Sequence, residues 1–188
     1  NLGALLGDRI RLSNWYNHPD VFIRSLATRG SLGGLHPAIL EITSFLNACP
    51  FDYIIVETVG VGQSEVEIAG LADATVVVMV PEAGDEIQTM KAGLMEVADI
   101  FVVNKSDRPD ADLFVRNLNL MLDPKFGGHH EEIPVVKTIA SIGEGLRELK
   151  KKIDLNMKRR KNTQKKVHRQ AERAFFLIQK KRMKGISK

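Results

Sequence analysis

The sequence of 188 residues has one cysteine, Cys49, and no long apolar run. A single cysteine excludes an intrachain disulfide and is typical of a reducing compartment. The longest apolar run, residues 74–81, has the length of a strand, whereas a bilayer span needs roughly 18 apolar residues. We therefore expect a protein of the cytoplasm, or of the mitochondrial matrix if it is eukaryotic, with no membrane partner.

Acidic residues are nearly absent from the last part of the chain. Residues 150–188 hold 16 of the 27 Lys and Arg but only Asp154 and Glu172 among the 23 acidic residues, a net charge of +14. Residues 1–149 carry a net charge of −10. This change in character predicts an acidic domain over residues 1–149 and a basic helical arm over residues 150–188.

Four short apolar runs with many β-branched residues are spread along the acidic part. They cover residues 51–57, 74–80, 100–104 and 134–139. Each is apolar on both faces, which is typical of parallel strands covered by helices on both sides. The sequence thus predicts these four segments as strands of one sheet.

Apolar residues at helical spacing lie around these strands. One set is Ile39, Ile42 and Leu46 after Pro37, a second is Ile87, Met90, Leu94 and Met95, and a third is Leu113, Leu118 and Leu122. Alternating strands and helices predict an α/β fold with a mainly parallel sheet and right-handed crossovers. Ligands of such sheets bind at the carboxyl ends of the strands, where the polar residues of this sequence gather.

The strongest motif is the sequence NKSD at the end of the third predicted strand. Its Asp107 carboxylate can accept from both the ring N–H and the exocyclic amino group of guanine. Asn104 can support the loop and the purine edge, while the stem of Lys105 lies over the ring. Adenine lacks these two donors and would leave Asp107 unpaired. Four such residues could also form a simple polar turn, but their place at the end of a buried strand favours guanine recognition.

Two further loops follow predicted strands. Ala140 and Ser141 come after the fourth strand and can present a backbone N–H to the guanine carbonyl oxygen. Glu57 ends the first strand and can hold Mg²⁺ through a water. Gly60, in the loop after it, can bring an N–H close to a γ-phosphate, so that the loop would order with triphosphate.

Five blocks together resemble the MeaB/ArgK-type GTPases, the G-protein chaperones associated with methylmalonyl-CoA mutase. The blocks are LLGDRIR (5–11), IRSLATRGSLGGL (23–35), ETVGVGQSE (57–65), AGDEIQTMKAGLMEVAD (83–99) and NKSD (104–107). The resemblance covers residues 3–149 and implies a P-loop NTPase-like G domain that binds GTP or GDP with Mg²⁺.

The resemblance also implies roles for matched positions. Glu57 matches the acid associated with Mg²⁺, and Asp8 in the first switch is a second candidate ligand. Asn104, Lys105 and Asp107 match the guanine-specificity residues. The second switch runs over residues 60–65 and includes Gly62 and Gln63. A further switch that contacts the mutase matches Gly84, Asp85, Glu86 and Gln88.

The phosphate-binding motif GxxxxGK[ST] does not occur in residues 1–188. That motif supplies the amides, the lysine and the Ser or Thr that hold the phosphates and Mg²⁺. Members of the family carry it upstream of the LLGDR block, so we expect a truncated chain that binds GTP poorly by itself. A degenerate relative that does not hydrolyse GTP is the second interpretation.

The function that the resemblance implies is a GTP-hydrolysing chaperone. It would serve an adenosylcobalamin-dependent acyl-CoA mutase, gate loading of the cofactor and protect the mutase. The basic arm implies a homodimer, because relatives dimerise through such an arm. A basic helix can also bind nucleic acid, but the arm has little aromatic interleaving and no recognisable nucleic-acid motif, so we expect no nucleic-acid partner. Two competing hypotheses are a GTPase accessory of amino-acid transport and a metal-delivery GTPase. The absence of a Cys and His cluster disfavours metal delivery.

Overall fold

The computed structural model describes residues 12–27, 36–58, 71–81, 95, 97–123 and 132–161. The chain divides into two compact units, Asn1–Glu67 and Ile68–Lys188. All of the described strands lie in the second unit.

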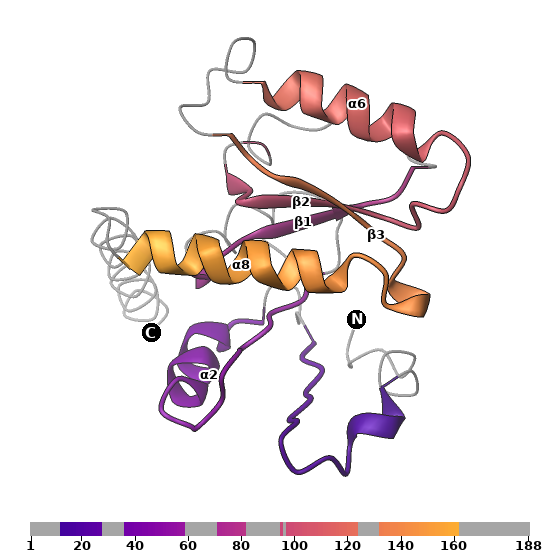
Figure 1. Ribbon diagram of the computed structural model, residues 1–188. Helices are drawn as coiled ribbons and strands as arrows, with labels where there is room; N and C mark the ends of the chain where they lie inside the picture. The colour runs from indigo at the N-terminus through magenta and orange to yellow at the C-terminus, as the bar shows by residue number, and fades with distance from the viewer. Residues whose placement is uncertain are drawn as a thin grey trace. The chain divides into compact units, whose positions relative to one another are not determined.

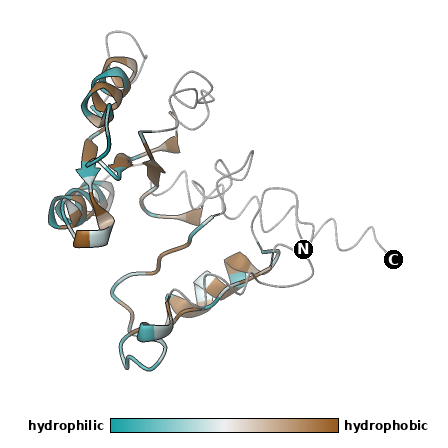
Figure 2. Cartoon of the chain, turned by 90° about the vertical axis from the view of Figure 1, so that its right-hand side faces the viewer, coloured by the Kyte–Doolittle hydropathy of each residue, from teal (hydrophilic) through white to brown (hydrophobic). Residues whose placement is uncertain are grey.

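The second unit contains a parallel sheet of three strands, β1 (Val76–Met79), β2 (Ile100–Asn104) and β3 (Val135–Thr138), in the order β1-β2-β3. Both neighbouring pairs are parallel, with Val76 opposite Ile100 and Asn104 opposite Thr138. Three of the four predicted strands are therefore confirmed, and so is their parallel arrangement. In Figure 2 these strands are mainly brown, as expected for a sheet that is covered on both faces.

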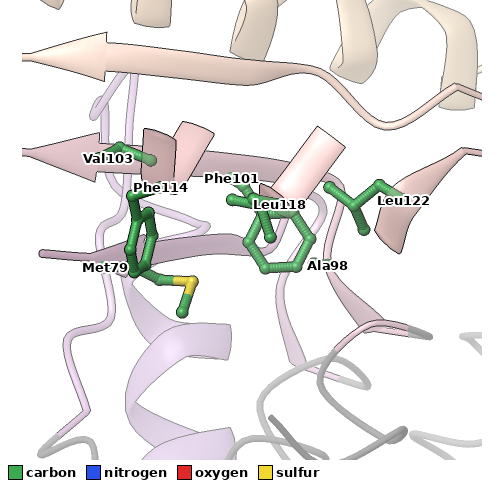
Figure 3. Packing of buried hydrophobic residues seen from close by; sticks show 7 residues of the cluster. All are labelled: Met79, Ala98, Phe101, Val103, Phe114, Leu118 and Leu122. Atoms are coloured by element: carbon green, nitrogen blue, oxygen red, sulfur yellow. The ribbon is translucent and has the colours of Figure 1, made fainter. Parts of the chain in front are cut away.

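Helix α6 (Ala111–Leu122) covers one face of this sheet. Its buried residues are Ala111, Phe114, Leu118 and Leu122, which recur every three or four positions and so form one stripe. They pack with Met79, Ala98, Phe101 and Val103 in the main core cluster (Figure 3). The prediction of a helix here is confirmed, but Leu113 is 55% exposed and Phe114 takes its place in the core, because Leu113 does not share the helical phase of Leu118.

Helix α8 (Leu146–Lys161) covers the opposite face (Figure 1). Its Leu149 and Ile153 pack against the buried residues Ile100, Val102 and Val136. Strand β2 is thus buried on both faces, whereas Val78 in β1 is 60% exposed. The helix runs without a break across the expected domain boundary at residues 149 and 150. The division into a G domain and a basic dimerisation arm stays a prediction, since residues 162–188 lie outside the described residues.

The first unit has the short 3-10 helix η1 (Ser13–Trp15) and helix α2 (Ile39–Leu46). The predicted helix after Pro37 is confirmed, and at its start the Ala38 N–H donates to His36 Nδ1 at 3.1 Å. Leu40 and Thr43 are the buried residues of α2. The Thr43 hydroxyl donates to the Ile39 carbonyl oxygen at 2.9 Å, so its polar group is satisfied inside the helix.

The prediction of a strand over residues 51–57 is wrong. These residues are assigned to no strand, and Phe51, Tyr53 and Ile55 are 37%, 46% and 89% exposed. An apolar, β-branched run favours extended backbone, but a strand also needs a hydrogen-bonded neighbour, and no described strand pairs with this segment.

Most of the predicted helix around Ile87 lies outside the described residues. Met95, near the end of this predicted helix, is helical, partly buried and packed against the main core cluster.

Candidate nucleotide-binding site

The polar edge of the second unit lies where β2 and β3 end. Asn104 is the last residue of β2 and pairs in register with Thr138, the last residue of β3. Because the strands are parallel and adjacent, the loops that follow them leave the sheet at the same edge. The structure therefore brings the NKSD loop and the loop of Ala140 and Ser141 together, as the sequence predicts for a guanine site.

The Asn104 side chain joins the two loops directly. Its Oδ1 accepts a hydrogen bond from Thr138 Oγ1 at 3.1 Å and a second from the Ala140 N–H at 3.1 Å. A backbone bond from the Ser106 N–H to the Thr138 carbonyl oxygen, also 3.1 Å, continues the strand pairing past Asn104. One side-chain oxygen and one backbone bond thus fix the spacing between the two loops.

The NKSD loop turns sharply at Lys105. Lys105 has φ 57° and Asp110 has φ 64°, both in the left-handed region that side chains other than glycine seldom adopt. The Arg108 N–H donates to the Lys105 carbonyl oxygen at 3.1 Å and closes the turn. Lys105 and Asp107 are both exposed, so the turn leaves both side chains accessible to a ligand. Left-handed residues without glycine are typical of sites where the surrounding structure imposes the conformation.

The second loop is built around two glycines. Ala140–Ile142 form the 3-10 helix η2, which ends at Gly143 with φ 76°. The Ile139 N–H donates to the Glu144 carbonyl oxygen at 3.1 Å, which folds the loop back on itself. Gly145, also at φ 76°, lies so close to β3 that an added Cβ would overlap the Lys137 carbonyl oxygen. This packing holds Ala140 and Ser141 at the sheet edge, where both are exposed.

Sequence reasoning missed Thr138. Its side chain is 2% exposed, and its hydroxyl holds the Asn104 carboxamide. A hydroxyl residue at the end of an otherwise apolar strand, directly before a polar loop, is the signal that could have found it. The Lys137–Asp112 ion pair, which links β3 to α6, was also missed, but its side chains are 45% and 90% exposed.

The other predicted site residues divide between the first unit and the part of the chain that is not described. Glu57 is exposed and lies in the first unit, in a segment that forms neither helix nor strand. Asp8, Gly60, Gly62, Gln63, Gly84, Asp85, Glu86 and Gln88 lie outside the described residues.

Among the residues that the structure describes, no group of three His, Cys, Asp or Glu could hold a metal ion. A lone exposed carboxylate does not make a Mg²⁺ site. Glu57 would therefore need further ligands from outside the described residues to hold Mg²⁺.

Comparison with known proteins identifies the fold class of this chain and then its family. The fold is that of the P-loop NTPase-like G domains: the crystal structure of a LAO/AO transport system kinase matches with a TM-score of 0.63 and 25% identity, over 78% of this chain and 48% of that one. A family model described as "Methylmalonyl Co-A mutase-associated GTPase MeaB" matches residues 1–188. The chain belongs to this family of mutase-associated GTPases.

The names of similar curated proteins support the assignment to this family. A protein of Pyrococcus abyssi named as a GTPase is 53% identical over 154 residues, which cover 80% of this chain and 48% of that protein. A fused isobutyryl-CoA mutase of Geobacillus kaustophilus is 42% identical over 142 residues, 74% of this chain and 13% of that protein. The chain spans about half the length of the Pyrococcus protein, so the activity and partners of a whole protein enter below as proposals.

Proposed function

We propose that this chain forms the guanine-recognising part of a GTP-hydrolysing chaperone for an adenosylcobalamin-dependent acyl-CoA mutase. One observation carries the guanine assignment. The Asn104 Oδ1 accepts from both Thr138 and Ala140 and so joins the NKSD loop to the loop that follows β3. Two loops held at one spacing can contact opposite ends of the same purine edge.

The chemistry of the exposed residues at this edge fits guanine. Asp107 is an exposed carboxylate that can accept from the ring N–H and the exocyclic amino group together. Lys105, exposed on the same turn, can cover the ring face with its alkyl stem. Adenine offers neither donor to Asp107, so a site built this way selects guanine by leaving Asp107 unpaired with adenine.

Mutase association is supported by the family and by one relative in particular. The family model bears the name of methylmalonyl-CoA mutase, and the Geobacillus relative carries the matching region within a fused isobutyryl-CoA mutase. We infer from this fusion that the separate chain also acts on an acyl-CoA mutase. We propose that GTP binding and hydrolysis gate cofactor loading and protect the mutase.

The remaining parts of the proposal depend on Glu57, which has no further metal ligands beside it among the described residues, and on residues that the structure does not describe. Mg²⁺ would be held by Glu57 and Asp8, and the switches over residues 60–65 and 84–88 would report the nucleotide state to the mutase. Residues 162–188 would dimerise. Cys49, the one cysteine, supports a reducing compartment, which we take to be the cytoplasm.

None of the helices in the described part of the chain combines the length and the apolar character that a bilayer span requires.

Guanine selectivity is the first test. Because residues 1–188 contain no GxxxxGK[ST] motif, we expect tight binding only in an extended protein, defined as this chain preceded by the phosphate-binding segment of a family member. Calorimetry should show that the extended protein prefers GTP to ATP by about 100-fold or more, since two hydrogen bonds to a charged acceptor are lost with adenine. Residues 1–188 alone should bind GTP far more weakly.

A single substitution separates guanine recognition from general purine binding. Asp107→Asn should weaken GTP binding at least about tenfold, through loss of a charge-assisted bond worth about 1.5–3 kcal/mol. It should also favour XTP, because the new amide N–H can donate to the C2 carbonyl of xanthine. Asp110→Asn removes the same charge three residues away and is the matched control. Equal affinity for GTP and ATP in the extended protein would refute the assignment.

Partner choice has its own test. The extended protein should bind purified methylmalonyl-CoA mutase with an affinity that differs between GDP and a non-hydrolysable GTP analogue. Gel filtration and calorimetry measure this directly. If neither the GDP-bound nor the GTP-analogue-bound protein binds methylmalonyl-CoA mutase, that mutase is excluded as the partner, while guanine binding stays intact.

A further inference from the structure

The side chains of β1 and β2 do little to define how the two strands pair. β1 reads VVVM and β2 reads IFVVN, and each carries apolar residues on both of its faces. Alternating polar and apolar residues fix the register of a strand, because a shift by one residue moves the apolar side chains from the core to the solvent face. In β1 such a shift mostly exchanges one valine for another. The observed register, with Val76 opposite Ile100, therefore needs a further cause.

A buried carboxylate lies at the start of this strand pair. Thr75 directly precedes β1 and Asp99 directly precedes β2, and the two residues are 6% and 7% exposed. The Thr75 N–H donates to Asp99 Oδ2 at 2.8 Å, and the Asp99 N–H donates to the Thr75 carbonyl oxygen at 2.9 Å. Both backbone groups of Thr75 are thus bonded to Asp99. The bond to the carboxylate is charge-assisted and about twice as strong as a neutral hydrogen bond.

The contact between Thr75 and Asp99 can form in one register only. A shift of β1 along β2 would carry the Thr75 N–H away from Asp99 by roughly 3.3 Å for each residue. The buried carboxylate would then lose an amide donor, and a buried charge that lacks its hydrogen bonds is strongly unfavourable. Other registers are therefore penalised by Asp99, although the apolar side chains of β1 would tolerate them.

We propose that Asp99 sets the register in which β1 pairs with β2. The inference depends on the strand geometry and not on the proposed function. It still bears on the candidate site, because Met79 at the end of β1 lies opposite Val103. The same register thus decides how far Asn104 and the loop after it extend beyond the end of β1.

The hydroxyl of Thr75 takes no part in the contact. Its Oγ1 is buried and has no hydrogen-bond partner in the part of the chain that the structure describes, while the backbone of Thr75 makes both bonds to Asp99. Position 75 therefore needs only a backbone N–H, whereas position 99 needs an acceptor. The competing explanation is that packing sets the register and that Asp99 adds stability alone.

Cross-strand disulfides measure the register directly. Val78 lies opposite Val102, so Val78→Cys with Val102→Cys places two thiols on Cα atoms roughly 4.8 Å apart, which a disulfide can bridge. Val78→Cys with Ile100→Cys is two residues out of register, and its Cα atoms are roughly 8 Å apart, too far for a disulfide. Both pairs are made with Cys49→Ser, which removes the one natural cysteine. Mass spectrometry of peptides after mild oxidation identifies the disulfide that forms.

The expected result differs between three variants. With Asp99 and Thr75 unchanged, the 78–102 disulfide should form and the 78–100 disulfide should not. Asp99→Leu keeps a similar size without an acceptor, and it should lower the yield of the 78–102 disulfide about tenfold or more, the equivalent of one hydrogen bond to a charged group. Asp99→Asn keeps an acceptor oxygen and should keep the disulfide. Thr75→Val keeps the backbone N–H and should keep it too.

Each other outcome contradicts the inference. If Asp99→Leu melts at a lower temperature but forms the 78–102 disulfide in full yield, packing sets the register and Asp99 only adds stability. Loss of this disulfide in Thr75→Val would show that the hydroxyl is needed. A 78–100 disulfide with Asp99 unchanged would contradict the register itself. Asp99→Ala serves the same comparison if circular dichroism shows that Asp99→Leu does not fold, and loss of the 78–102 disulfide in a folded Asp99→Asn variant would also refute the role of the acceptor.

Discussion

Two glycines in the loop after β3 share one backbone conformation but differ in their surroundings. Gly143 and Gly145 both have φ 76°. A Cβ at Gly143 would meet nothing within 4 Å, whereas a Cβ at Gly145 would overlap the Lys137 carbonyl oxygen of β3. Substitution of each by alanine therefore separates the cost of a left-handed residue from the cost of a steric clash.

The magnitudes follow from these two terms. Gly143→Ala should destabilise the protein by about 1–2 kcal/mol, which is the cost of placing a Cβ in the left-handed region. Gly145→Ala should cost the same amount plus about 1–3 kcal/mol for the overlap, as in overpacked cores. The backbone oxygen cannot move aside like a flexible side chain, because Lys137 belongs to strand β3 and pairs in register with Val103 of β2. We expect Gly145→Ala to be the more damaging change by a clear margin.

Urea denaturation followed by circular dichroism at 222 nm measures this difference, since α6 and α8 dominate the helical signal of the described part of the second unit. Guanine nucleotide binding by the extended protein is the second readout, because Gly145 supports the loop of Ala140. Equal destabilisation by the two substitutions would show that the close approach of Gly145 to β3 is absent in solution. A Gly143→Ala variant of unchanged stability would contradict the left-handed conformation.

Three further predictions concern the core, the surface and the NKSD turn. Leu118→Ala should lower the free energy of unfolding by about 2–5 kcal/mol in chemical denaturation, because Leu118 is fully buried. Leu120 on the same helix is 55% exposed, so Leu120→Ala should change the free energy of unfolding by no more than about 0.5 kcal/mol. Similar losses for the two variants would contradict the assigned buried face of α6. Asp112→Asn should change the free energy of unfolding in chemical denaturation by less than about 1 kcal/mol, because the ion pair with Lys137 is exposed. In high salt no difference from the unsubstituted protein should remain. A larger loss would mean that the ion pair is shielded from water. Lys105→Gly should raise the melting temperature while lowering guanine affinity, since glycine relieves a left-handed strain of about 1–2 kcal/mol but removes the alkyl stem from the base; unchanged GTP affinity would exclude Lys105 from the site.

Which side of a helix is buried was predictable only in part. The spacing of Leu118 and Leu122 indicated a helix, and α6 is there. The sequence groups Leu113 with Leu118 and Leu122 as apolar residues at helical spacing, although the stripe that packs on the sheet begins with Ala111 and Phe114. A residue type indicates a tendency to be buried, whereas the helical phase decides which residues can be buried together.

The sequence by itself determined the alternation of strands and helices, the extent of β1, β2 and β3 to within about two residues at each end, and the guanine motif at the end of β2. These depend on short-range patterns, namely apolar runs, helical spacing and a four-residue motif. The tertiary structure alone decided that residues 51–57 lack a strand partner among the described residues, that Gly145 packs on Lys137, and that Thr138 and Ala140 meet at Asn104. The physical reason is that Asn104 and Thr138 are 34 residues apart, and only the pairing of β2 with β3 brings their polar groups within hydrogen-bond distance.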